Sequence, residues 1–191
     1  ERGFPAIAIC DRNGLYGAVK HNGACVQLGL DPIVGVELEV LDFGKSLGRV
    51  TLLCHGQTKG LGWSVLCQVV SAAAKQNKQA AVAVERRTLA KLMQQGGGTI
   101  LLGPQSNLGD SPQAGSSSSI ESQLSEWLQL FKRPGSLAIE VVSHLTEPKS
   151  RFSTAQAKLF LQLADSHKVP AVLTNAVRYL EPDDALTADV L

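Results

Sequence analysis

Several side chains that could do chemistry stand at the ends of short apolar runs typical of buried strands. Asp11 follows A-I-A-I and Cys10, Glu37 lies within I-V-G-V-E-L-E-V, and His144 follows L-A-I-E-V-V-S. Carboxylates and imidazoles at the carboxyl ends of strands are where α/β enzymes usually keep catalytic groups. Arg12 stands directly after Asp11, however, and a guanidinium repels cations and has no lone pair to donate. The pattern is therefore that of an active site or of the remains of one.

The elements that must position these residues alternate along the chain. Apolar and β-branched runs predict strands over 6–10, 33–40, 49–54, 80–84, 99–102, 137–142 and 170–174. Helical spacing predicts helices over 15–30, 63–74, 88–94, 120–131 and 154–167. Strands that are each followed by a helix favour a parallel, barrel-like α/β fold, whose active site gathers at the carboxyl ends of the strands.

Two of the predicted helices carry apolar stripes. In the first, the stripe is formed by Leu15, Val19, Val26 and Leu30. In the second, it is formed by Leu124, Trp127, Leu128 and Phe131. The first stripe is weakened by Gly23. We expect the second stripe to pack in the core, because an aromatic stripe at helical spacing is far more often core than a cofactor site.

The length and composition indicate one globular domain, taken here as 1–191. The chain has 191 residues, of which 44% are hydrophobic and 18% charged. Residues 104–119 are rich in Ser, Gly and Pro and predict a mobile surface loop. E-R-G-F-P at the start resembles a helix end, and A-D-V-L at the end reads as the inside of a helix. We therefore expect a domain that is truncated at both ends.

Charge and motif content exclude several classes of function. The net charge of +1 gives no field that would favour nucleic acid or an anionic membrane. Neither a membrane-spanning run nor a signal peptide is present in the sequence, and we expect a cytoplasmic protein without a membrane partner. The four cysteines show no C-x-x-C spacing, which favours buried thiols over disulfides or structural zinc. Phosphate-binding glycine loops and the G-x-S-x-G elbow are also missing from the sequence.

Longer motifs surround the candidate residues. They read A-I-C-D-R-N-G-L-Y-G-A-V, G-L-D-P-I-V-G-V-E, I-E-V-V-S-H and P-A-V-L-T-N-A-V-R-Y-L-E-P-D-D-A. In order and spacing they resemble the PHP domain (polymerase and histidinol phosphatase) at the amino end of bacterial DNA polymerase III alpha-type polymerases. The corresponding family motifs are A-I-T-D-H-x-x-L-Y-G-A-V, G-I-x-P-I-I-G-x-E, L-E-I-Q-x-H and P-x-V-A-T-N-D-V-H-Y-L-x-P-x-D-A. The resemblance covers nearly the whole chain and implies a distorted (β/α)7 barrel whose amino-terminal strand is missing here.

The resemblance also implies a set of metal-site positions. The family holds a cluster of metal ions with His, Asp, Glu and Cys ligands, and such ions activate water and clamp a phosphate. Asp11, Glu37 and His144 stand at positions where the family has ligands. The other ligand positions are lost: they are occupied by Arg12, Pro104, Ala176 and Arg178. The family's first H-x-H motif would precede residue 1.

Two arginines at these positions argue against a metal. A unit charge ~4 Å from a dication costs about 8 kcal/mol at an effective dielectric constant of 20. We expect Arg12 and Arg178 to pair with Asp11 and Glu37 instead, so that guanidinium groups replace the metal ions. The predicted site is vestigial, with no metal and no catalytic residue. Simpler interpretations stay open: His144 as an ordinary hydrogen-bonded residue, and Glu37 exposed to solvent with Glu39.

Within the family, the D-R-N and N-A-V-R-Y forms resemble error-prone alpha-type polymerases of damage tolerance. The resemblance implies a parent DNA-directed DNA polymerase, a nucleotidyltransferase that uses magnesium on palm carboxylates outside this chain. This domain then needs no cofactor of its own and supports the polymerase body, meeting DNA through the parent enzyme and contacting other subunits of the assembly. Two alternatives stay open: an active metal-dependent phosphoesterase or 3′–5′ exonuclease, and a protein-interaction module with an exposed apolar patch near Trp127.

Overall fold

The strands of the chain form one curled sheet in the computed structural model, which describes residues 3–56, 60–76, 82–109, 117–148 and 150–177. The elements follow in the order β1 (Ala6–Arg12), α1 (Ala18–Leu28), β2 (Asp31–Asp42), β3 (Lys45–Cys54), α2 (Leu61–Gln76), β4 (Ala83–Glu85), α3 (Arg86–Met93), β5 (Gly98–Leu102), α4 (Ser117–Leu130), β6 (Leu137–Val141), α5 (Thr154–His167) and β7 (Ala171–Leu173). The predicted helix 154–167 matches α5, and the other predicted elements differ mainly at their ends.

The sheet is mixed rather than parallel. Its strand order is β1-β2-β3-β5-β6-β7, with β4 pairing to β2. β3 runs antiparallel to both β2 and β5, whereas the other pairs are parallel. The expectation of a helix after every strand is wrong at β2, because Phe43 and Gly44 turn the chain directly into β3 with φ of 50° and 79°. Left-handed residues in a two-residue turn match the twist of a hairpin.

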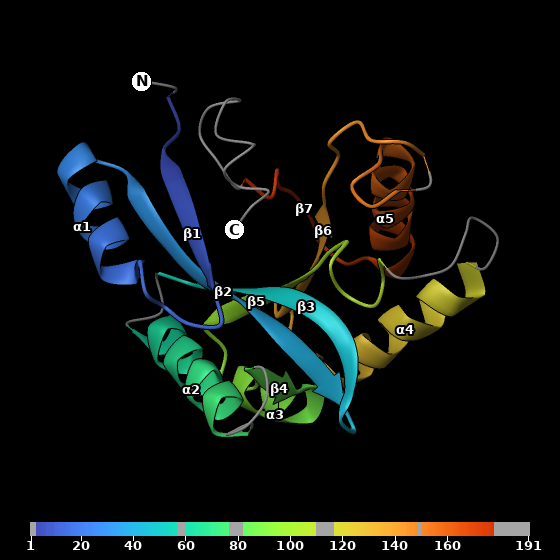
Figure 1. Ribbon diagram of the computed structural model, residues 1–191, viewed down its shortest axis with the longest axis horizontal. Helices are drawn as coiled ribbons and strands as arrows, with labels where there is room; N and C mark the ends of the chain where they lie inside the picture. Colours follow the sequence, from blue (N-terminus) through green and yellow to red (C-terminus); the bar gives the residue numbers. More distant parts are fainter. Residues whose placement is uncertain (1–2, 57–59, 77–81, 110–116, 149, 178–191) are drawn as a thin grey trace.

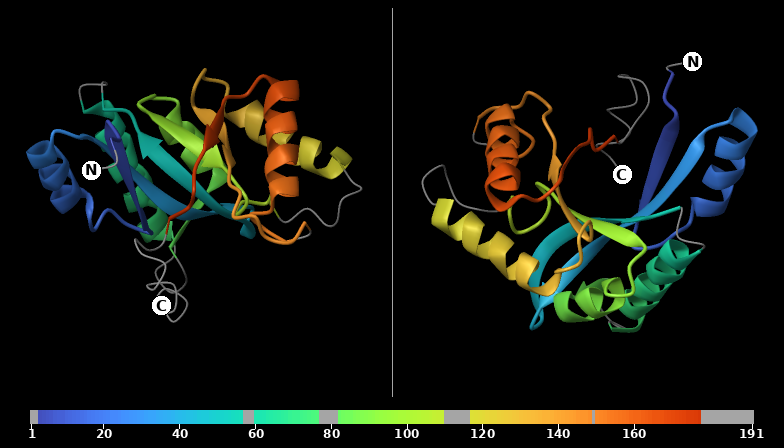
Figure 2. Two further views of the ribbon diagram at one scale, coloured as in Figure 1. Left: turned by 90° about the horizontal axis from the view of Figure 1, so that it is seen from above. Right: turned by 180° about the vertical axis from the view of Figure 1, so that it is seen from behind.

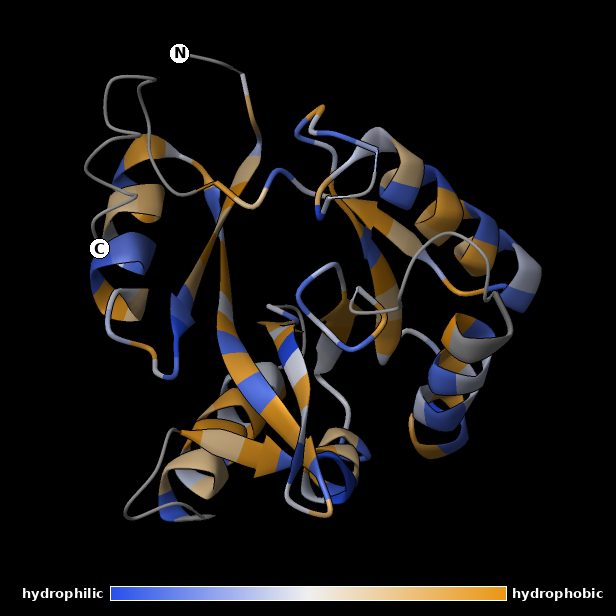
Figure 3. Cartoon of the chain, turned by 45° about the vertical axis from the view of Figure 1, so that its right-hand side comes forward, coloured by the Kyte–Doolittle hydropathy of each residue, from blue (hydrophilic) through white to orange (hydrophobic). Residues whose placement is uncertain are grey.

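The helices lie on the outer side of the curled sheet, and β1 and β7 are its two edges (Figures 1 and 2). Side chains alternate across β2, so Val36, Leu38 and Val40 are buried in the core while Glu37 and Glu39 face the inner side. Hydrophobic residues concentrate along the central strands and alternate with polar ones on the helices (Figure 3). Among the described residues, the core also includes Leu52, Leu66, Val69, Leu89, Met93, Ile100, Leu124, Ile139 and Phe160.

The two predicted apolar stripes differ in how far they are buried. Trp127 on α4 is fully buried, as predicted, and this leaves it outside any exposed patch. On α1, Val19 and Val26 are instead 80% and 66% exposed, and the helix packs through Ala18 and Cys25. The helix lies at the edge of the sheet (Figure 1), and its buried residues are the small Ala18 and Cys25 rather than the valines of the stripe.

The polar segment 104–119 is only partly a loop. Pro104, Ser106 and Leu108 are buried in a turn after β5, and α4 begins at Ser117. The turn is fixed to the β2–β3 hairpin, because Arg49 N donates to Gln105 O at 2.9 Å and Asn107 N donates to Leu47 O at 2.7 Å. The prediction of a mobile loop is therefore wrong at 104–109 and at 117–119, and residues 110–116 lie outside the described part.

The cysteines are free thiols, but the prediction that all of them are buried is wrong. Cys25 is buried and Cys54 and Cys67 are half-buried, whereas Cys10 is exposed on the edge strand β1. Within the part of the chain that the structure describes, no helix is long and apolar enough to cross a membrane.

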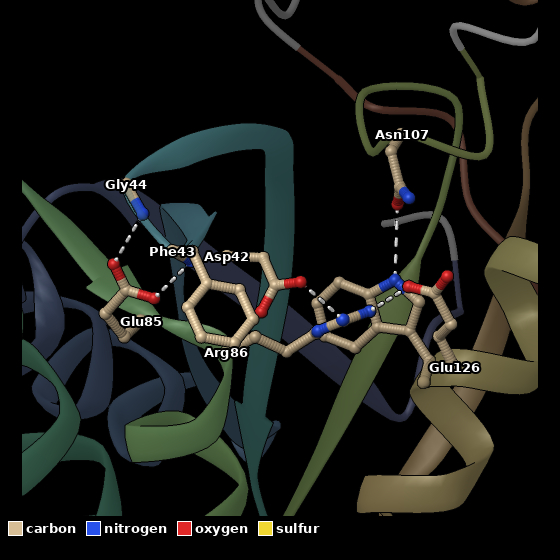
Figure 4. A network of polar contacts seen from close by, with 8 residues as sticks. Asp42, Phe43, Gly44, Glu85, Arg86, Asn107 and Glu126 are labelled. Carbon is tan, nitrogen blue, oxygen red and sulfur yellow. Dashed lines mark hydrogen bonds and ion pairs between the residues drawn. The ribbon is translucent and has the colours of Figure 1, made fainter.

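A buried arginine joins the hairpin to two helices on the outer side (Figure 4). The side chain of Arg86 is 7% exposed; its Nη2 lies 2.7 Å from Asp42 Oδ2, and its Nη1 lies 3.1 Å from Glu126 Oε2. Its guanidinium carbon lies 5.6 Å from the ring centroid of Trp127, whose Nε1 donates to Asn107 Oδ1 at 3.2 Å. The network connects the end of β2 to α3, α4 and the 104–109 turn.

We predict that Arg86→Met lowers the free energy of unfolding by about 3 kcal/mol, because removing one partner of a buried ion pair leaves an uncompensated charge. Arg87→Met is the matched control: Arg87 is exposed, and its guanidinium carbon lies 4.8 Å from the ring centroid of Phe43. We expect a loss of about 1 kcal/mol or less there. Urea denaturation measures the free energy of unfolding of both variants. Equal losses would contradict the view that Arg86 connects the hairpin to α3 and α4.

Candidate functional site

The best-defined cluster of charged residues lies on the inner face of the sheet, where β1 and β2 run side by side. Arg12 and Glu37 are register partners in this parallel pair. Glu37 is only 7% exposed, and its neighbours Val36 and Leu38 pack on the opposite, helix-covered face. The alternation of β2 therefore forces a carboxylate into a half-enclosed position on the inner side.

Two guanidinium groups bind the Glu37 carboxylate. Arg12 Nε lies 3.0 Å from Glu37 Oε1, and Arg49 Nε on β3 lies 2.6 Å from the same oxygen. Arg49 Nη2 also donates to Glu37 O at 3.2 Å and to Asn13 Oδ1 at 2.9 Å. The expected Arg12–Glu37 pair is present, and the alternative of a solvent-exposed Glu37 is wrong. Both contacts are charge-assisted, and they compensate the charge of a carboxylate that is nearly buried.

Asp11 serves a different part of the structure. It is in register with Val36, and its Oδ2 accepts a hydrogen bond of 2.6 Å from Gly17 N, at the start of α1. A carboxylate at the first amides of a helix satisfies an otherwise unpaired donor and interacts favourably with the helix dipole. The expected ion pair of Asp11 with Arg12 is not formed because successive side chains on a strand point to opposite faces. Arg178 lies outside the described residues.

His144 follows β6 on an exposed segment. Its Nε2 lies 2.8 Å from the carbonyl oxygen of Asn175, and its ring stacks on Phe152 with centroids 4.9 Å apart. A carbonyl only accepts, so Nε2 carries the hydrogen and only Nδ1 keeps a lone pair. This is the geometry of a hydrogen-bonded surface histidine, and it joins the segment after β6 to the segment after β7.

Two other positions singled out in the sequence follow β5 and β7, the strands on either side of β6. Pro104 is buried in the turn after β5, where Ser106 N donates to Gly103 O at 3.0 Å. Ala176 follows β7 with φ of 45°. Neither side chain offers a metal donor atom, and Pro104 is part of the turn that is hydrogen-bonded to the hairpin.

The described residues do not fit the metal cluster that the resemblance implies. Glu37 Oε1, the best-placed donor, is already in contact with two permanent cations. Within the described ranges, no three His, Cys, Asp or Glu side chains are grouped closely enough to hold an ion. The two ion pairs of Glu37 connect β1, β2 and β3 electrostatically.

Cys10 lies on the same inner face as Glu37. Its sulfur packs close to Gly35, where an added Cβ would come within 2.8 Å of it. Burial of the sulfur and then the charges of Glu140, Glu37 and Asp11 raise the pKa of the Cys10 thiol to about 12. Although the residue as a whole is exposed at the sheet edge, its thiol is therefore held protonated.

Sequence reasoning missed Arg49, Asn13 and Glu140. Arg49 opens the predicted strand 49–54, and in the structure it is the register partner of Glu39 rather than of Glu37. Its contact with Glu37 is diagonal across the antiparallel strands β2 and β3. It could be inferred only once these strands were known to form a hairpin. Glu140 lies in the I-E-V-V-S-H motif, and its Oε1 accepts a hydrogen bond of 2.7 Å from Thr174 Oγ1. The alternation of L-A-I-E-V could have shown that its side chain faces away from the core.

Comparison with known sequences agrees with the resemblance found in the sequence motifs. A family model described as "PHP domain" matches residues 1–144. The DNA polymerase III subunit alpha of Buchnera aphidicola subsp. Schizaphis graminum is 30% identical over 188 residues, covering 95% of this chain and 15% of that protein. The Escherichia coli K12 subunit is 29% identical over 187 residues with the same coverage. An error-prone DNA polymerase of Corynebacterium efficiens is 41% identical over 56 residues, 29% of this chain. The chain thus spans about 15% of the length of the first two relatives.

Solved structures show the same fold at low identity. A putative metal-dependent phosphoesterase from Bifidobacterium adolescentis has a TM-score of 0.51 at 13% identity, covering 97% of this chain and 85% of that one. An amidohydrolase from Chromobacterium violaceum, with bound sulfate and no metal, has a TM-score of 0.60 at 12% identity, covering 97% and 86%. At this identity the likeness establishes the fold alone.

The two arginines on Glu37 are predicted to differ in their contribution to stability. Arg49→Met should lower the free energy of unfolding by about 2 kcal/mol, because it removes several hydrogen bonds to a buried charge. Arg12→Met should cost less than about 1 kcal/mol, since the Arg12 side chain is 56% exposed and its ion pair is screened by water. Urea denaturation of both variants tests this, and an equal or reversed order would show that Arg49 is not the main partner.

The raised pKa of Cys10 predicts slow alkylation. The higher pKa lowers the thiolate fraction at pH 8, and the greater nucleophilicity of a more basic thiolate offsets part of that loss, so iodoacetamide should modify Cys10 at least tenfold more slowly in the folded chain than in urea. Glu140→Gln should accelerate the reaction, and Glu147→Gln, at an exposed position, should not. Mass spectrometry of the Cys10 peptide gives the rates. Equal rates in the folded and unfolded chain would contradict the prediction.

Proposed function

Because the chain belongs to the PHP domain family, we propose that it is a non-catalytic PHP domain of an error-prone DNA polymerase. In this proposal the domain is a structural support for template-directed DNA synthesis in damage tolerance. It packs against the polymerase body of the same protein in the cytoplasm and reaches DNA through the parent enzyme. Magnesium and the nucleotidyl-transfer carboxylates belong to that parent, outside this chain.

The contact that carries the proposal is the double guanidinium pairing of Glu37. A carboxylate at a metal-ligand position is useful to a cation only if its oxygens are accessible and its surroundings are negative. Here Arg12 stands in place of the family's histidine and Arg49 adds a second positive charge at 2.6 Å. A cation would have to displace both groups, which already compensate the buried charge.

The error-prone assignment is supported by the form of the motifs. D-R-N at 11–13 and N-A-V-R-Y at 175–179 depart from the metal-competent pattern, and a relative of 41% identity over 56 residues is named as an error-prone polymerase. The relatives that cover most of the chain are named as subunits of DNA polymerase III. The error-prone interpretation predicts a domain without bound metal or nuclease activity, whereas a metal-competent domain would bind metal and could cleave DNA.

Metal analysis combined with a nuclease assay tests the proposal. We predict that the full-length protein, after removal of the palm metal by chelation and gel filtration, retains no stoichiometric zinc or manganese. We further predict no 3′–5′ degradation of a labelled primer when manganese is added. Elemental analysis and gel electrophoresis are the measurements. Bound metal together with cleavage that is lost on Glu37→Gln would identify an active phosphoesterase and overturn the proposal.

A reconstruction provides the positive control. Arg12→His, Pro104→Cys, Ala176→Asp and Arg178→His restore the family's donors, and Arg49→Met removes the second cation from Glu37. We predict that this combination raises manganese affinity by orders of magnitude in isothermal titration, whereas the four restorations without Arg49→Met gain much less. No gain in either protein would show that charge replacement is not the reason the site lacks metal.

A further inference from the structure

A groove lies between α2 and α3 on the outer side of the sheet, away from the Glu37 cluster. The two helices are in contact and run side by side in Figure 1 and in the right-hand view of Figure 2. The groove has a volume of about 720 Å³, and its lining includes Trp63, Cys67, Ala72, Lys75, Lys91 and Leu92. Because Glu37 faces the inner side, the groove does not depend on the state of that site or on the proposed function.

The lining of the groove combines apolar side chains with uncharged polar ones, since Ser64, Gln68, Ser71 and Thr88 also line it. α2 packs on the sheet through Val65, Leu66 and Val69, which are fully buried. This leaves the other face of the helix, including half-buried Cys67 and Ala72, toward the groove. Trp63 at its first turn is 44% exposed, a large apolar surface in contact with water. Half-exposed tryptophans beside apolar grooves are favoured anchor points for partner proteins.

The charges around the groove are positive. Lys75 near the end of α2 and Lys91 on α3 both line it, and neither helix contains an Asp or Glu. The acidic residue directly before α3, Glu85, instead accepts hydrogen bonds of 3.1 Å from Phe43 N and Gly44 N at the hairpin turn. An occupant with apolar side chains on one face and carboxylates beside them would complement both the lining and the lysines.

We propose that this groove binds an acidic amphipathic helix of a partner protein. Its apolar residues, at a spacing of three and four, lie against Trp63 and Leu92, and its carboxylates face Lys75 and Lys91. This is the helix-in-groove mode of recognition. A single-stranded nucleic acid is the less suitable occupant, because it needs several stacking rings along a basic track, and the groove offers one ring and two lysines.

Tryptophan fluorescence provides the test. The isolated chain is used once circular dichroism and a cooperative urea transition have shown that it folds. Of its two tryptophans, Trp127 is fully buried, so acrylamide quenching reports mainly on Trp63. The probe is a synthetic sixteen-residue peptide with Leu at i, i+3, i+7 and i+10 and Glu at the flanking positions. We expect it to protect Trp63 from quenching in a saturable way. Binding should weaken at least tenfold in Lys75→Glu/Lys91→Glu and stay unchanged in Lys20→Glu/Lys158→Glu, where both lysines are exposed on other helices.

Two further measurements keep the result decisive even if the reversed variant unfolds. Raising the salt concentration should weaken binding to the unaltered chain, and a peptide with Lys in place of Glu should not protect Trp63. Absence of protection by the acidic peptide, or equal protection by both peptides, would overturn the proposal. Protection by oligothymidylate that is lost in Lys75→Glu/Lys91→Glu, without binding of the acidic peptide, would overturn it in favour of a nucleic-acid site.

Discussion

The two-residue alternation of β2 is the constraint from which most of the structure follows. Val36, Leu38 and Val40 are each buried in the core, and this fixes the register of the strand. The side chain of Glu37 must then point to the inner side of the sheet, whatever groups are there to compensate its charge. A slip by one residue would bury the carboxylate under the helices, at a cost far above that of the ion pairs it now makes. The arginines on Glu37 are thus a consequence of how the core holds β2.

The same strand is fixed by arginines on both of its faces. On the inner face, Arg12 and Arg49 hold Glu37 from β1 and β3. Beyond the last core residue of the strand, Arg86 holds Asp42 from α3 and extends the connection to Glu126 on α4. β2 is hydrogen-bonded to β1, β3 and β4, so these ion pairs reinforce contacts that the sheet already makes. A change at β2 is therefore transmitted to both layers of the domain.

The sequence was sufficient for the positions of most elements, which depend on local pattern, and the resemblance to the PHP family was sufficient to expect Arg12 beside Glu37. Periodicity located the helices, and the parallel register of β1 and β2 follows from two apolar runs joined by a helix. It was insufficient for β3, since R-V-T-L-L-C is compatible with either strand direction and the turn at Phe43-Gly44 carries no Asn-Gly signal. Missing that hairpin also meant missing Arg49, whose partner is set by strand direction.

Asp11 shows that a position matching a family ligand in sequence does not establish what the side chain contacts. It occupies a family ligand position in sequence, yet its carboxylate binds the amide of Gly17 at the start of α1. A carboxylate at a strand end can serve a metal ion or a helix terminus, because each role needs only an accessible oxygen there. Arg12 has no such second role among its described contacts, and its only ion pair is with Glu37. Asp11 and Arg12 thus act on opposite faces of β1: the first contacts the start of α1 and the second pairs with Glu37.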